Sequence, residues 1–99
     1  MTIREQIEAV EQLRKLWELS FPAIEPPPNG TFASWIGAYP QSIIAFALSR
    51  TVSKVRRMDN AGTPMQTADA ARYTASVMRN EYLGNHRIPS QISAATKAA

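Results

Sequence analysis

The segment PQSIIAFALSRTVSKVRRMDN, residues 40–60, decides the fold class. Residues three and four positions apart form one face that is apolar except for Thr51, and this spacing is the pattern of an amphipathic α-helix. The face consists of Ile44, Leu48, Thr51, Val52, Val55 and Met58. This face is widened by Ile43, Phe46 and Ala47. We therefore expect the N-terminal end of the helix to be buried nearly all round. Pro40 suits a first helical turn, and Asn60-Ala61-Gly62 is a typical stop.

The residues before this segment predict a helix over 2–20. Its apolar residues recur at helical spacing on one side: Ile3, Ile7, Val10, Leu13, Leu16 and Trp17. Thr2 and Glu5 have the spacing of a capping box, in which the threonine oxygen accepts a backbone N–H. The opposite face is charged, and we expect it to be solvated: Arg4, Glu8, Glu11, Arg14, Lys15 and Glu18.

Two more helices are predicted, over 31–38 and 66–83. The first is capped by Thr31 or Ser34, and the second by Thr63 or Thr67. In the first, Phe32 and Trp35 share a face; with Tyr39 they suit either the protein core or a platform for stacking bases, and we favour the core. In the second, four residues face inward: Ala70, Tyr73, Val77 and Met78.

These elements predict an all-α protein, a small orthogonal bundle of about four helices. The prolines at 26–28, followed by Asn29-Gly30, predict an extended connector that ends in a turn. A chain of 99 residues holds one domain, which we place at 1–88. The small and polar residues 89–99 predict a flexible tail.

Composition and motifs exclude several classes of chemistry. Cysteine is absent, and His86 is the only histidine, so we expect no disulfide, no metal site and no cofactor. No glycine-rich phosphate loop and no nucleophile with an activating base occurs, which predicts a protein that is not an enzyme. The longest apolar stretch is too short to cross a bilayer, and the first residues lack the pattern of a secretory signal, so we expect a cytoplasmic protein.

Charge is distributed unevenly along the chain. Residues 1–25 carry three basic and five acidic side chains, whereas residues 26–58 carry four basic side chains and no acidic one. Arg50, Lys54 and Arg57 fall within about 60° on one helix, and we call them the basic ridge. Arg72 and Arg79 share a face of the next predicted helix. These five residues are candidates for contacting nucleic-acid phosphates; the alternative is an ordinary solvated surface.

Residues 40–82 resemble the C-terminal helical domain of the DnaD-like replication-initiation proteins of bacteria and phages. The resemblance is carried by the helix around SIIAFAL at 42–48 and by the following sequence YTASVMRN at 73–80. Glu81 stands where a tryptophan is usual in the family. The resemblance implies contact with DNA during replication, with Tyr73, Arg79 and Asn80 as candidate positions.

We therefore expect a small, non-catalytic nucleic-acid-binding module, acting in bacterial or phage DNA replication. Two alternatives remain open. One is a protein–protein adaptor or regulatory domain that docks a partner, or a second copy in a homodimer, through Trp17, Phe21 and Phe32. The other is a structural subunit of a larger assembly.

Overall fold

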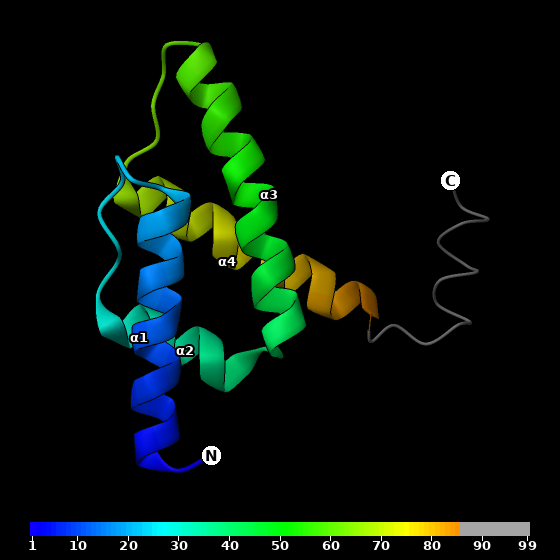
Figure 1. Cartoon of the computed structure of the whole chain (residues 1–99). Helices are drawn as coiled ribbons and strands as arrows, with labels where there is room; N and C mark the ends of the chain where they lie inside the picture. The colour runs from blue at the N-terminus through cyan, green and yellow to red at the C-terminus, as the bar shows by residue number, and fades with distance from the viewer. Residues whose placement is uncertain (86–99) are drawn as a thin grey trace, which may run out of the picture.

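Four α-helices form the fold of the protein (Figure 1). The structure is a computed structural model that describes residues 1–85. They are α1 (Ile3–Ser20), α2 (Asn29–Ala38), α3 (Gln41–Asn60) and α4 (Thr67–Asn85). No strand occurs among the described residues. The predicted all-α bundle is confirmed. The predicted tail at 89–99, and His86 and Arg87, lie outside the described residues.

The helices pack in consecutive pairs. α1 packs on α2, and α3 packs on α4, which crosses it steeply in Figure 1. α3 also contacts α1 and α2, so it joins the two pairs. α3 is thus the central helix of the fold. Pro40, which suits a first helical turn, instead has an extended backbone and is the N-cap of this helix.

An aromatic cluster fills the centre of the first pair. The ring centroid of Trp17 lies 4.7 Å from that of Phe21, 6.1 Å from that of Phe32 and 6.4 Å from that of Trp35. All four side chains are buried, which confirms a core role for the aromatic residues of α2. The indole N–H of Trp17 donates to the carbonyl oxygen of Ile24 at 3.0 Å, so the one polar atom of this ring is satisfied.

The structure corrects the predicted apolar faces at four positions. Ile3, Ile7 and Leu16 on α1 are exposed, although Val10, Leu13 and Trp17 of the same helix are buried. Leu16 instead lines an open groove of about 400 Å³ between α1, α2 and the start of α3. Phe46 is 41% exposed, so the N-terminal end of α3 is not buried all round. In each case no other helix covers that part of the predicted face.

The helix starts differ from the predictions in their caps. Thr2 caps α1 as expected: its hydroxyl oxygen accepts the backbone N–H of Glu5 at 3.1 Å. α2 begins at Asn29, two residues earlier than predicted, and neither Thr31 nor Ser34 caps it. At the start of α4, the carboxylate of Asp69 accepts the N–H of Gln66 at 3.2 Å, whereas the hydroxyl groups of Thr63 and Thr67 donate to the carbonyl oxygens of Met58 and Glu25.

Two side chains hold the proline connector against the helices. Thr67 donates its hydroxyl proton to the carbonyl oxygen of Glu25 at 2.8 Å. Arg14, which we expected to be solvated, donates through Nε and Nη2 to Oδ1 of Asn29 at 2.9 and 2.7 Å, and through Nη2 to the carbonyl of Pro27 at 3.3 Å. The prolines therefore serve as a fixed link from α1 to α2.

Candidate nucleic-acid interface

The basic ridge lies along one flank of α3. Arg50 and Arg57 are exposed, and Lys54 between them is half-buried. About one helical turn separates each from the next, so the three residues are spaced about 6 Å and about 4.5 Å apart along the helix axis. The three residues lie on one flank, as predicted, because α3 is an unbroken helix over Gln41–Asn60.

Aromatic rings flank two of the three cations. The guanidinium of Arg50 lies 5.9 Å from the ring centroid of Phe46, and the ammonium of Lys54 lies 5.8 Å from that of Tyr73 on α4. Both distances are within the range of cation–π attraction. The contacts restrict where the two cations point without neutralising them. The apolar pattern of α3 predicts Phe46 inside the core, and no local pattern in the sequence indicates its place beside Arg50.

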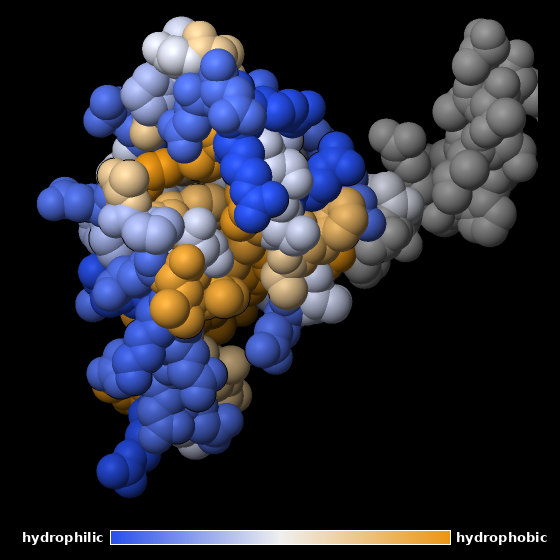
Figure 2. All heavy atoms as spheres, turned by 45° about the horizontal axis from the view of Figure 1, so that its top comes forward, coloured by the Kyte–Doolittle hydropathy of each residue, from blue (hydrophilic) through white to orange (hydrophobic). Residues whose placement is uncertain are grey.

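No acidic side chain neutralises the ridge within residues 1–85. The ion pairs in this part of the chain join Arg4 to Glu8 and Arg72 to Asp69, both at 4.0 Å and both between exposed groups. The acids of α1 therefore leave Arg50, Lys54 and Arg57 unpaired. Figure 2 shows strongly hydrophilic residues over α3 in the upper part of the view, with apolar residues below them between α1 and α3.

Arg72 and Arg79 do not join this surface. Thr74 faces α3, because its hydroxyl oxygen lies 2.7 Å from that of Thr51. Around α4, both arginines lie about 140–160° from Thr74. They are exposed, but they project from the side of α4 that faces away from α3, and Arg72 has Asp69 as a neighbour. The five predicted residues thus form two separate basic surfaces.

Tyr73 and Asn80, the other positions that the family resemblance singles out, differ in exposure. Tyr73 is half-buried under Lys54, whereas Asn80 is exposed. Arg56 is also exposed but lies on the other flank of α3, about 100° from Arg57. It provides a natural comparison for the ridge.

The residues proposed for docking a protein partner lie inside the fold. Trp17 and Phe32 have no exposed surface and Phe21 has almost none. A partner that binds the folded surface cannot reach these rings. The large apolar side chains that are exposed lie elsewhere, most of them on or next to α1.

No group of three acidic or histidine side chains within residues 1–85 is placed to hold a metal ion. None of the four helices has the length and hydropathy to span a bilayer.

Comparisons with known proteins add no relative. No protein-family model matches the chain, and searches of curated proteins and of solved structures also found no match. The resemblance of residues 40–82 to the DnaD-like proteins stays a prediction.

Proposed function

We propose that the protein is a small, non-catalytic nucleic-acid-binding module that contacts the phosphate backbone through the basic ridge of α3. The observation that carries this proposal is the accessible and unneutralised charge of Arg50 and Arg57. Ordinary solvated faces mix charges of both signs, whereas residues 26–58 contain no acid at all.

The spacing of the ridge suits a polyanion. Its residues recur about 4.5–6 Å apart along α3, and their long, flexible side chains allow each cation to reach a separate phosphate of one strand. Each phosphate that a basic side chain neutralises releases condensed counterions, and this release favours binding. Contacts of this kind position a protein on nucleic acid and carry no base sequence, so we propose binding with little sequence preference.

Arg72 and Arg79 have a different part in this proposal. Because they face away from α3, they do not extend the ridge along the same strand. They offer a second contact to another strand or to a neighbouring segment of nucleic acid. The DnaD-like resemblance, which implicates the same helix, supports a role in bacterial or phage DNA replication in the cytoplasm.

Fluorescence anisotropy with labelled DNA of mixed sequence tests the ridge. The Arg50→Ala, Arg57→Ala double variant should bind at least about tenfold more weakly, because it loses two of three phosphate contacts. The control is the Lys15→Ala, Arg56→Ala double variant, which removes the same charge from exposed positions outside the ridge. Thermal unfolding should be similar in all three proteins, since none of these side chains is buried.

Equal weakening in the two double variants would mean that net charge alone governs binding and would overturn the proposed ridge. Absence of binding by the wild-type chain at low salt would overturn the function itself. The single variants Arg56→Ala and Arg57→Ala repeat the comparison. Each removes one charge, and the two positions lie on different flanks of α3.

A further inference from the structure

The N-terminal half of α1 presents an apolar side that no other part of the described chain covers. Ile3 is 78% exposed and Ile7 54% exposed, although both continue the side of the helix on which Val10 is buried. In Figure 1 the first turns of α1 extend beyond α2, which explains why the core stops at Val10. Large β-branched side chains on a helix favour burial, so this side is suited to an interface.

A hollow of about 290 Å³ lies beside these two isoleucines. Its apolar wall consists of Ile3, Ile7 and Val10 from α1 with Gly30 and Ala33 from α2, and the polar side chains of Gln6, Glu11 and Asn29 complete it. A Cβ atom added at Gly30 would meet no atom within 4 Å, so the small residue leaves open space on that wall. The hollow is large enough to receive an aliphatic side chain from another molecule.

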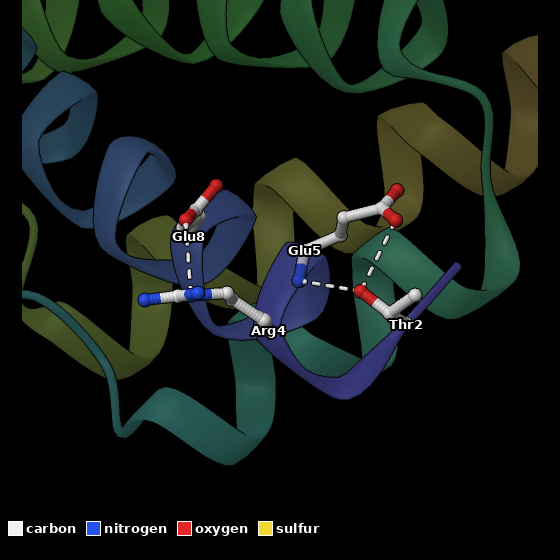
Figure 3. A network of polar contacts seen from close by, with 4 residues as sticks. All are labelled: Thr2, Arg4, Glu5 and Glu8. Atoms are coloured by element: carbon white, nitrogen blue, oxygen red, sulfur yellow. Dashed lines mark hydrogen bonds and ion pairs between the residues drawn. The ribbon is translucent and has the colours of Figure 1, made fainter.

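The end of α1 is held in helical form without a packing partner. Besides accepting the N–H of Glu5, the Thr2 hydroxyl donates to the Glu5 carboxylate at 3.1 Å (Figure 3). The N–H of Gln6 donates to the carbonyl of Thr2 at 3.0 Å. The cap keeps Ile3 and Ile7 on one side of the helix, where a rigid surface binds at a lower entropic cost than a frayed end.

Charges of both signs border this apolar side. Arg4 and Glu11 lie seven residues apart, about 20° from each other around α1, and both lie about 40–60° from Ile7 on the same, outer side of the helix. Arg4 points to Glu8 (Figure 3) and reaches it at 4.0 Å, and both side chains are largely exposed. Such a pair contributes little to stability, so Arg4 is free to turn to a different carboxylate.

We propose that the occupant of this surface is a second copy of the chain, with the two α1 helices packed antiparallel about a twofold axis near Ile7 and Glu8. In that arrangement Arg4 of each copy faces Glu11 of the other, the Ile7 side chains of the two copies meet at the centre, and Ile3 extends the apolar contact on either side of the axis. A twofold interface needs one patch that is complementary to itself. The Arg4 and Glu11 pattern has that property, which favours a second copy over a partner of a single charge.

This interface is independent of the proposed nucleic-acid contact. Its residues belong to α1 and the start of α2, whereas the ridge lies on α3. A dimer would present two ridges joined by the paired α1 helices. Failure of either proposal therefore leaves the other standing.

Analytical ultracentrifugation of the full chain tests the dimer. The wild-type protein should sediment as a dimer within concentrations up to on the order of 1 mM. Ile7→Asp should weaken dimerisation roughly 100-fold, because both copies place a charge in the apolar centre. Leu19→Asp is the control, since Leu19 is exposed at the far end of α1 and should leave the dimer unchanged. Circular dichroism shows that each variant is folded.

Charge exchange tests the antiparallel register. Arg4→Glu and Glu11→Arg should each weaken self-association, because like charges then face each other. An equimolar mixture of the two single variants should form heterodimers, since every facing pair is again of opposite sign. The double variant that carries both changes should dimerise like the wild type. A monomeric wild-type protein over the whole concentration range, or single variants that do not pair on mixing, would overturn the proposal.

Discussion

The hydroxyl oxygens of Thr51 on α3 and Thr74 on α4 lie 2.7 Å apart, and both side chains are fully buried where the two helices cross. Each hydroxyl also lies within hydrogen-bond distance of a carbonyl oxygen of its own helix, Thr51 of Ala47 at 2.9 Å and Thr74 of Ala70 at 2.8 Å. One proton joins the two hydroxyl groups and the other is donated to a carbonyl. The pair thus places a satisfied polar contact inside an otherwise apolar interface.

A double-mutant cycle should reveal this coupling. Thr51→Val and Thr74→Val keep the side-chain shape but remove the hydroxyl, and each should lower the free energy of unfolding by about 1 kcal/mol. The double variant should cost less than the sum of the two, because the second substitution has no mutual hydrogen bond left to remove. Urea denaturation measures all four proteins. Strictly additive effects would show that the two hydroxyl groups do not stabilise each other.

Leu48 anchors α3 in the core, so its truncation should be costly. Leu48→Ala should lower the free energy of unfolding by about 2–5 kcal/mol, through lost burial and the cavity that remains. Leu19→Ala makes the same chemical change on the surface and should stay within about 0.5 kcal/mol of the wild type. Comparable losses in the two variants, measured by urea denaturation, would contradict the burial assigned to Leu48.

Gly62 ends α3 with a backbone φ of 79°, in the left-handed region. Its N–H donates to the carbonyl of Asp59 at 3.0 Å, and the next N–H, of Thr63, donates to Met58 at 2.9 Å. Gly62→Ala should destabilise the protein by about 1 kcal/mol although the added methyl group meets open space. Gly37→Ala, within α2, should have the opposite sign. Thermal unfolding of the two variants shows whether the backbone conformation of the glycine, and not the room for an added methyl group, decides the change in stability.

Salt should weaken DNA binding in proportion to the number of phosphate contacts. If all three ridge residues contact phosphates, the logarithm of the affinity for duplex DNA should fall with the logarithm of salt concentration at a slope of about −2.7. In the Arg50→Ala, Arg57→Ala variant the slope should become shallower by about 1.8. An unchanged slope would assign the salt dependence to other residues.

The features that sequence predicted well are those that depend on near neighbours in the chain. The spacing of Phe32 and Trp35 placed both rings on one face of α2, and Gly62 marked the end of α3. The charges of the basic ridge share a flank because helical geometry alone puts them there. Each of these inferences needs only the dihedral preferences of one segment.

The features that the sequence did not predict depend on where along their lengths two helices are in contact, and on which face each turns to the other. Periodicity showed that Ile3 and Ile7 share a side with Val10, but not that α2 ends its contact with α1 before reaching them. It likewise showed that Arg72 and Arg79 share a face, but not that this face turns away from α3. The contact of Thr51 with Thr74 fixes that orientation, and no local pattern encodes it.

The pairing of consecutive helices also bears on how fast the chain reaches its native state. Because α1 meets α2 and α3 meets α4, most contacts close short loops and incur little closure entropy. Chains with such low contact order fold within microseconds to milliseconds. The contacts that span the longest stretches of chain are those of the α1–α2 pair with α3, so we expect the docking of that pair to be the late step, which should leave apolar surface open to aggregation only briefly.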